Sequence, residues 1–166
     1  MMRVLGAAKS PLLSECGFHA HDCWEVILNL SGEGVETVCD EESPFYPGSV
    51  TVCPPFAPHN KRCEAGAHWQ DIYFRFEDAA FSLERLRFSD NSDHAMERLM
   101  ELLPSACARR VPNSPFPAAL GEAVCALLRE WDEHDAPADP LTERLRSEIS
   151  RRFTDPEFTP RAAMAA

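Results

Sequence analysis

Four side chains with the donor atoms of a metal or ligand site lie in the N-terminal half of the chain. His19 and His21 stand two residues apart, and Glu25 follows four residues later. A third imidazole, His59, comes after the Pro47-Gly48 dipeptide. If the first three lie on one strand, their odd numbering puts them on the same face of it. Three imidazole nitrogens and one carboxylate oxygen form a donor set that divalent transition metals accept, so we expect the four to share a site.

The same side chains also suit a polar pocket that holds no metal. Imidazole N–H groups and a carboxylate can orient a hydroxylated or amino-bearing molecule through hydrogen bonds. Of the aromatic residues, Trp69 and Tyr73 could stack on such a ligand, whereas Trp24 is expected in the core. A divalent metal (zinc, nickel, iron or manganese) is the alternative occupant, bound by His19, His21, Glu25 and His59. The predicted ligand-binding residues are His19, His21, Glu25, His59, Trp69 and Tyr73.

The elements that must position these residues have the sequence signals of short strands and tight turns. The turns are predicted at Gly32-Glu33-Gly34, at the acidic residues 40–43 and at Pro47-Gly48. Several short strands without intervening helices predict an antiparallel barrel or sandwich over residues 1–90. The strands are predicted over residues 24–30, 35–39, 49–53 and 69–76.

Beyond residue 90 the hydrophobic pattern changes to helical spacing. A first helix is predicted around residues 96–103, with Ser92 or Asp93 as its cap and Pro104 as its end. A Pro-rich segment separates it from a second helix, and a third is predicted from Asp139-Pro140 to Phe153. The second helix has an apolar stripe that is either a dimer seam or the face that packs on the barrel. The residues predicted for a dimer interface are Leu120, Val124, Leu127, Leu128 and Trp131.

Composition excludes some classes of function for this polypeptide. Its formal net charge is −11 and its pI about 4.9, so it lacks the basic surface of a nucleic-acid-binding domain. The chain contains no apolar run long enough to span a bilayer, and no membrane partner is expected. Its seven cysteines are scattered and never spaced as CxxC, which predicts reduced thiols in the cytoplasm.

Three sequence stretches carry a resemblance to a known family. HAHDCWEVILNLSGEG and PGSVTVCPPFAPH resemble the two motifs of the cupin superfamily, and WQDIYFRF resembles the aromatic strand that follows them. With the helices and the tail TDPEFTPRAAMAA, the chain resembles the N-terminal half of an AraC-family transcription regulator. Leu13 and Phe56 stand where the cupin motifs usually have glycine, and Cys63 stands where asparagine is usual.

The resemblance implies a fold and a function. The expected fold is mainly β with α: a cupin-like antiparallel β-barrel (a double-stranded β-helix, or jelly roll) followed by two to three helices. Residues 1–90 would form the ligand-binding barrel, 91–153 a helical dimerisation region, and 154–166 the start of a truncated helix-turn-helix DNA-binding domain.

The expected function is that of a non-enzymatic sensor. It would bind a small-molecule effector, form a homodimer, need no cofactor and contact DNA only through the missing C-terminal domain. The alternative is a small metal-dependent cupin enzyme, an oxygenase or isomerase, in which the metal acts as a Lewis acid or oxygen binder.

Overall fold

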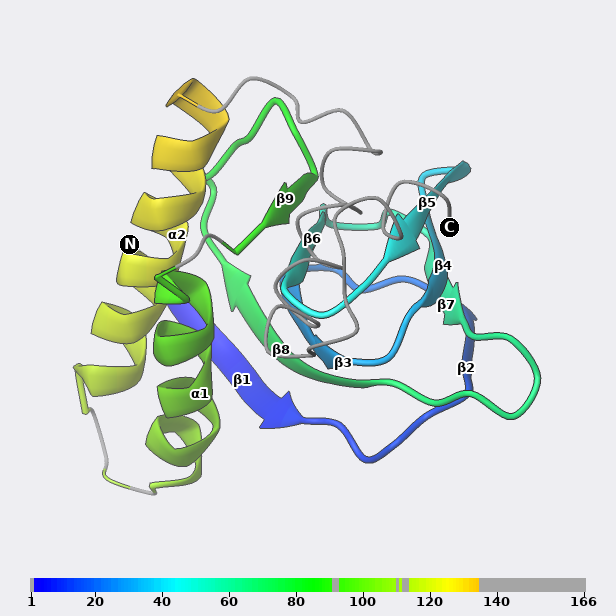
Figure 1. The fold of residues 1–166 in the computed structure, drawn as a ribbon. Helices are drawn as coiled ribbons and strands as arrows, with labels where there is room; N and C mark the ends of the chain where they lie inside the picture. The colour runs from blue at the N-terminus through cyan, green and yellow to red at the C-terminus, as the bar shows by residue number, and fades with distance from the viewer. Residues whose placement is uncertain (1, 91–92, 110, 112–113, 135–166) are drawn as a thin grey trace. The chain divides into compact units, whose positions relative to one another are not determined.

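Nine strands and two helices make up the part of the chain that the structure describes. The structure is a computed structural model, and it describes residues 2–90, 93–109, 111 and 114–134. Among these residues no helix is long and apolar enough to cross a membrane. In chain order the elements are β1 (Arg3–Lys9), β2 (Glu15–His19), β3 (Trp24–Ser31), β4 (Gly34–Val38), β5 (Glu41–Phe45), β6 (Ser49–Cys53), β7 (His59–Arg62), β8 (Gln70–Glu77), β9 (Arg87–Ser89), α1 (Ala95–Ala108) and α2 (Phe116–His134) (Figure 1).

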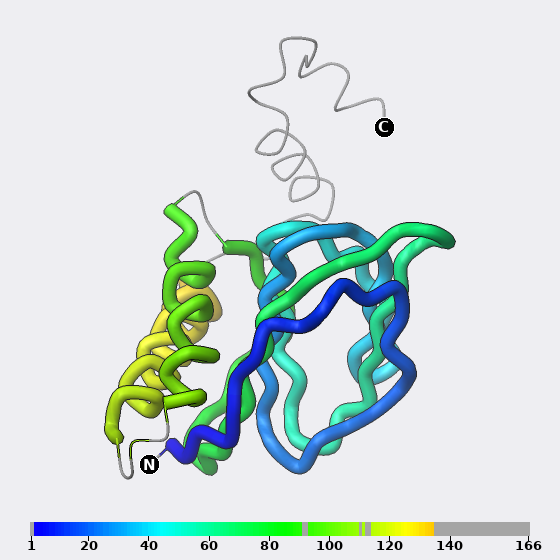
Figure 2. Tube along the Cα trace, turned by 90° about the horizontal axis from the view of Figure 1, so that it is seen from below, coloured from blue at the N-terminus to red at the C-terminus, as the bar shows by residue number. Residues whose placement is uncertain are grey.

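The strands form two antiparallel sheets. One has five strands in the order β1-β8-β3-β6-β9, and the other has four in the order β2-β7-β4-β5. Strands that are neighbours in the sequence therefore often belong to different sheets, as in a jelly roll. Both helices lie on the same side of the strands (Figure 2). The predicted fold class, a cupin-like antiparallel barrel followed by helices, is confirmed.

Alternation along the five-stranded sheet gives its two faces different chemistry. On β3, Val26 and Leu28 belong to the apolar cluster that includes the helices, whereas Glu25 and Ile27 face a cavity between the sheets. The apolar residues of this sheet therefore pack outward on the helices, and the intervening residues face the barrel interior. The same division separates Val50, Val52, Ile72, Phe74 and Phe76 from Thr51, Cys53, Asp71, Tyr73 and Arg75.

Helix α1 begins where two carboxylates accept its free backbone N–H groups. Asp90 accepts from the backbone N–H groups of Met96 at 3.0 Å and Glu97 at 2.9 Å, and Asp93 accepts from that of Ala95 at 3.1 Å. The residue at the N-cap position is His94, and Ser92, the other predicted cap, lies outside the described residues.

The prediction that Pro104 ends this helix is wrong, because α1 continues to Ala108. A proline inside a helix removes one hydrogen bond and is costly. Leu103 and Ala106, on either side of the proline, are both buried, and this burial holds the helix together across it.

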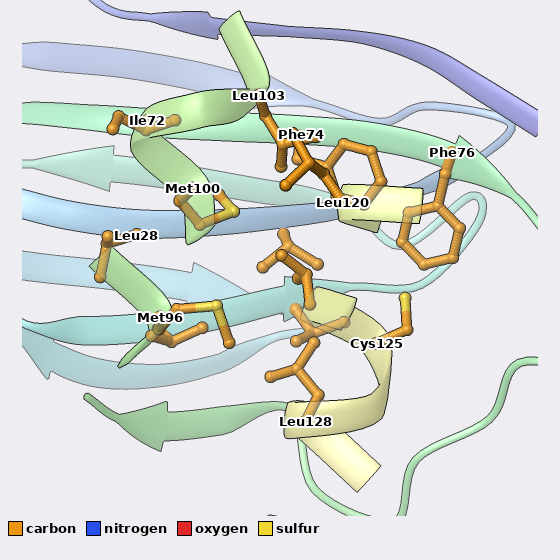
Figure 3. Packing of buried hydrophobic residues seen from close by; sticks show 14 of the residues in the cluster. Leu28, Ile72, Phe74, Phe76, Met96, Met100, Leu103, Leu120, Cys125 and Leu128 are labelled. Atoms are coloured by element: carbon orange, nitrogen blue, oxygen red, sulfur yellow. The ribbon is translucent and has the colours of Figure 1, made fainter. Parts of the chain in front are cut away.

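The apolar stripe of α2 packs within its own chain. Leu120, Val124, Leu128 and Trp131 are buried in the same cluster as the outward residues of the five-stranded sheet, and Leu127 packs against that cluster. Figure 3 shows side chains of both helices meeting those of the sheet. Four of the five residues predicted for a dimer interface are therefore buried against the sheet of their own chain, which corrects the prediction for those four, whereas Leu127 is only partly buried.

The two predicted glycine turns are confirmed, and the acidic turn is shorter than predicted. Gly32 and Glu33 connect β3 to β4, and Pro47-Gly48 connects β5 to β6. The turn between β4 and β5 consists of Cys39 and Asp40, which both have positive φ. Of the residues 40–43 predicted for this turn, only Asp40 belongs to it, because β5 already starts at Glu41.

The described residues belong to one compact unit that ends at His134. The helical region predicted at 91–153 is described only as far as His134, so the third helix lies outside the described residues. The predicted start of a DNA-binding domain at 154–166 also lies outside them.

Replacing Gly32 by alanine should destabilise the fold by at least about 2 kcal/mol. Gly32 has a φ of +80°, and a Cβ there would lie 2.2 Å from the carbonyl oxygen of His68 and 2.7 Å from the Cα of Trp69. Urea unfolding measures the change. Gly17→Ala is the matched control, because a Cβ at Gly17 meets nothing within 4 Å. Equal losses in both variants would contradict the prediction.

Leu128→Ala should lower the free energy of unfolding by about 2–5 kcal/mol, because it opens a cavity between α2 and the sheet. The side chain of Leu128 is fully buried, whereas that of Leu102 on α1 is 48% exposed. Leu102→Ala should therefore change stability by no more than about 0.5 kcal/mol. If the stripe formed a dimer seam instead, Leu128→Ala would lower the dimer fraction in sedimentation velocity and leave the chain folded.

Candidate functional site

The four predicted metal ligands come together, although they do not share one strand. His19 ends β2, Glu25 is the second residue of β3, and His21 lies in the connection between these strands. His59 begins β7 and pairs in register with His19. One ligand atom from each of the four lies within 4.8 Å of the others. The structure therefore brings the four side chains together, but the single strand assumed for His19, His21 and Glu25 is interrupted between His19 and Trp24.

Glu25 is the centre of this cluster. Its side chain is 3% exposed, and its Oε1 accepts a hydrogen bond from the Nε of Arg75 at 2.7 Å. Its Oε2 lies 3.1 Å from the Nε2 of His59 and 3.4 Å from that of His21. One carboxylate oxygen thus faces a guanidinium and the other faces imidazoles, so the buried charge is compensated on both sides.

Backbone carbonyls fix the tautomers of two histidines. The Nδ1 of His19 donates to the carbonyl of Gly17 at 2.8 Å, and the Nδ1 of His59 donates to that of Ala57 at 2.9 Å. In the neutral ring this leaves each Nε2 as the acceptor nitrogen, and in the protonated ring the Nε2 of His59 donates to the Oε2 of Glu25 at 3.1 Å. Orientation by a carbonyl at the other nitrogen is the arrangement that metal-binding histidines use.

The residues present fit a divalent transition metal. The Nε2 of His21 is buried and has no hydrogen-bond partner among the described residues. Together with the Nε2 atoms of His19 and His59 and the Oε2 of Glu25, it gives three nitrogen donors and one oxygen donor. Arg75 opposes such a cation, because its guanidinium shares the same carboxylate.

Burial and pairing set the charges of the cluster. Burial by itself raises the pKa of Glu25, but hydrogen bonds from His59 and Arg75 and the charge of Arg75 outweigh it, and the pKa lies below its ordinary value. Burial opposes protonation of His59, yet the hydrogen bonds with Glu25 and the Ala57 carbonyl raise its pKa. Burial lowers the pKa of His21, which favours the neutral ring.

A cavity of about 150 Å³ extends from this cluster between the two sheets. An engineered apolar cavity of about this size accepts benzene, so about six non-hydrogen atoms fit. Its apolar wall includes Leu13, Ile27 and Val38. Of the six predicted ligand-binding residues, His19, Glu25, His59, Trp69 and Tyr73 line it.

His21 lines a second hollow, of about 380 Å³, rather than the cavity. The two spaces adjoin, because Tyr73 and Arg75 line both. The predicted site is thus one cluster with space on two sides.

Seven polar residues that line the cavity were not predicted from the sequence: Ser10, Glu36, Thr51, Asn60, Lys61, Asp71 and Arg75. Asp71 and Arg75 have the same parity as Tyr73 on β8, which was the available signal. The Oγ1 of Thr51 donates to the Oε1 of Glu36 at 2.6 Å. Lys61 and Glu36 are paired in register on β7 and β4.

Two cysteines also line the cavity, and neither is suited to nucleophilic chemistry. Burial is the main cause that raises the pKa of the Cys16 and Cys53 thiols. A thiol with a raised pKa is mostly protonated at neutral pH and is a poor nucleophile. All seven cysteines of the chain, each within the described residues, are free.

The backbone conformation of Phe56 is one that glycine adopts easily, although the residue here is not glycine. Its φ is +64°, a left-handed conformation that favours glycine, and its side chain is 74% exposed. Its backbone N–H donates to the carbonyl of His21 at 2.6 Å. The loop therefore keeps the backbone shape that glycine would supply and ties it to the residue beside the cluster.

No protein-family model matches this chain, and no curated protein matches it either. Solved structures do match. A protein of Thermotoga maritima described as a predicted oxalate decarboxylase is 23% identical over 42% of this chain and 61% of its own, with a TM-score of 0.37. A cupin protein of Bacteroides fragilis is 15% identical over 46% of this chain and 66% of its own, with a TM-score of 0.39.

A third similar structure is a dimethylsulfoniopropionate (DMSP) lyase of Ruegeria pomeroyi. It is 19% identical over 50% of this chain and 40% of its own, with a TM-score of 0.38. The aligned part spans less than two thirds of each of the three proteins. The likeness at these scores concerns a shared β-rich arrangement and carries no information on activity.

The Glu25–His59 pair should give the metal-free protein a stability contribution with a defined pH window. Because the pKa of Glu25 is lowered, its ionised form stabilises the fold fully above pH 4.5, the ordinary pKa of a glutamate. This stabilisation is lost as the pH falls through the folded-state pKa. Because the pKa of His59 is raised, its protonated form stabilises the fold fully below pH 6.5, the ordinary pKa of a histidine. This stabilisation is lost as the pH rises through the folded-state pKa.

We therefore expect the loss of unfolding free energy in Glu25→Gln to be largest between pH 4.5 and 6.5. Urea unfolding in the presence of a chelator, at several pH values, measures it. His94→Gln is the control, because the His94 side chain is 65% exposed. A loss that is the same at every pH would refute the pairing.

Proposed function

We propose that this chain is the ligand-sensing domain of an AraC-type transcription regulator and binds a small polar molecule in its barrel. The observation that carries the proposal is the cavity between the sheets, which combines an apolar wall with several buried polar groups. Cavities of this kind orient a ligand through a few hydrogen bonds while burying most of its surface.

The strands that line the cavity also support the helices, which favours a sensor over a simple binding protein. On β3, Glu25 faces the cavity and Val26 packs under the helices; on β8, Arg75 and Phe74 are divided in the same way. A ligand that moves either strand therefore changes the surface on which α1 and α2 rest. Such coupling is typically about 1–3 kcal/mol, and it requires unequal ligand contacts in two states.

Dimerisation and DNA binding belong to the same proposal. We propose a homodimer in the cytoplasm whose interface is a surface other than the buried stripe of α2. DNA would be bound only by a C-terminal domain, since the net charge of −11 gives this polypeptide no basic surface. Sedimentation velocity at micromolar concentration tests the dimer.

A metal-dependent cupin enzyme, an oxygenase or isomerase, is the second candidate. One observation favours it: the buried Nε2 of His21 has no hydrogen-bond partner among the described residues, and it lies in one cluster with His19 and His59, whose Nδ1 atoms are held by backbone carbonyls. A bound divalent metal would supply Lewis-acid chemistry at this end of the cavity. Glu25 would hold it together with the histidines, and Arg75 would keep the carboxylate oriented.

The metal content of the purified protein separates the two candidates. We expect protein purified without a metal-affinity step to hold far less than one metal per chain, and to stay folded in a chelator, because Arg75 already compensates Glu25. Elemental analysis and the unfolding midpoint measure this. About one metal per chain, lost in His21→Ala, would favour the enzyme instead.

A screen of small alcohols, amides and carboxylates tests the ligand site itself. We expect hits that raise the unfolding midpoint of the wild type and have no effect on Ile27→Trp, because a larger side chain at this wall position fills the cavity. Leu102→Trp, an exposed substitution on α1, is the matched control. Hits that act equally on Ile27→Trp bind elsewhere and would overturn the proposal.

A further inference from the structure

One of the two lysines of the chain is buried in the cavity. The sequence contains Lys9 and Lys61 as its only lysines, against fourteen arginines. Lys61 is 6% exposed and lines the cavity, whereas Lys9 is exposed on β1. A buried ammonium group is costly unless it is well paired, so its contacts decide what it does there.

The contacts of Lys61 are long for a buried cation. Its Nζ lies 3.4 Å from the Oδ2 of Asp71 and 3.3 Å from the Oδ1 of Asn29. Charge-assisted hydrogen bonds of this kind are usually about 2.7–2.9 Å long. The same Oδ2 accepts a shorter bond, of 2.9 Å, from the Nε1 of Trp69. Lys61 is therefore held loosely, and two of its three N–H groups have these partners.

Two aromatic rings also contact the ammonium group. The Nζ lies 4.6 Å from the ring centroid of Phe45 and 5.9 Å from that of Trp69. Among the described residues the third N–H of Lys61 has no oxygen acceptor, so it can donate to an acceptor on a ligand in the cavity.

The ammonium group of Lys61 lies at a different level of the cavity from Glu25. Its partners Asn29 and Asp71 are paired in register on β3 and β8, four residues along from the Glu25↔Arg75 pair, which is a strand length of about 13 Å. On β7, Lys61 is two residues from His59, and Ile27, Thr51 and Tyr73 line the cavity between the two levels.

Each carboxylate that lines the cavity has a cationic partner. Among the described residues the partner lies within 4 Å in every case, so neither these carboxylates nor Lys61 and Arg75 offer an unpaired charge to a ligand. The three pairs are Glu25–Arg75 at 2.7 Å, Glu36–Arg87 at 3.7 Å and Asp71–Lys61 at 3.4 Å.

We propose that Lys61 is the binding group for an uncharged oxygen, a hydroxyl or carbonyl, of the ligand, and that the ligand is a neutral polar molecule. This inference rests on the proposed function, since it names the ligand class of the same cavity. A carboxylate at Lys61 would lie beside Asp71, and two carboxylates would then share one ammonium group. A metal at the histidine cluster adds charge at the level of Glu25 and leaves the Lys61–Asp71 pair unchanged.

Malonamide and malonate test the ligand class. They have the same number of non-hydrogen atoms and two identical ends, so that either orientation brings the same group to Lys61. With lysine labelled with carbon-13 at Cε, only Lys9 and Lys61 give signals, and Lys9 is the internal control. In the presence of a chelator, we expect malonamide to shift the Lys61 signal saturably, and malonate to bind about tenfold more weakly or less.

Lys61→Met combined with Asp71→Asn removes the pair together and leaves no unpaired buried charge. We expect this double variant to stay folded and to bind malonamide about 10- to 100-fold more weakly, while Lys9→Met binds it as the wild type does. Equal binding of malonamide by the double variant would overturn the role of Lys61. Tighter binding of malonate would overturn the neutral ligand class.

Failure of this inference is distinguishable from failure of the proposed function. If neither probe shifts the Lys61 signal while screening hits still depend on the open cavity in the Ile27→Trp comparison, only the inference is overturned. If no hit depends on the cavity, the proposed function fails with it.

Discussion

Side chains on a strand point alternately to its two faces, and three strands of this chain use that constraint to separate two chemistries. On β3, β6 and β8, one set of alternate residues is apolar and packs under α1 and α2, and the other set is largely polar and lines the cavity. A shift of pairing by one residue would exchange the two sets and bury charges under the helices. The core and the site therefore depend on the same strand register.

The polar side chains that line the cavity can be buried because their charges are paired. Glu25 is almost fully buried, and its two oxygens are divided between Arg75 and the histidines. Removing one partner from such a network leaves an uncompensated charge, which costs more than the pair itself contributes. Pairing also restricts what the cavity can bind, since a ligand must match groups whose charges are already satisfied. The same interactions that make the interior stable thus narrow the class of ligand.

Much of the barrel could be predicted from local signals, and most of the failures came from tertiary context. Glycine turns and alternating strands gave the fold class, and the spacing of His19, His21 and Glu25 gave the cluster. Pro104 was misjudged because its cost is offset by burial on both sides, which no local pattern shows. Lys61 was missed because its importance depends on Asp71 and Phe45, which the fold brings beside it.

The buried stripe of α2 has a consequence for how a signal could leave the barrel. Gly121 allows the helix to approach the sheet closely, since a Cβ there would lie 2.6 Å from the ring of Phe74. Phe74 is next to Tyr73 and Arg75, which both line the cavity. Close-packed interiors do not absorb displacement smoothly, so movement of β8 must be taken up by the helix or by a change of packing. A ligand in the cavity is therefore separated from both helices by a single strand, because α1 also packs on β8 through Met100 and Leu103.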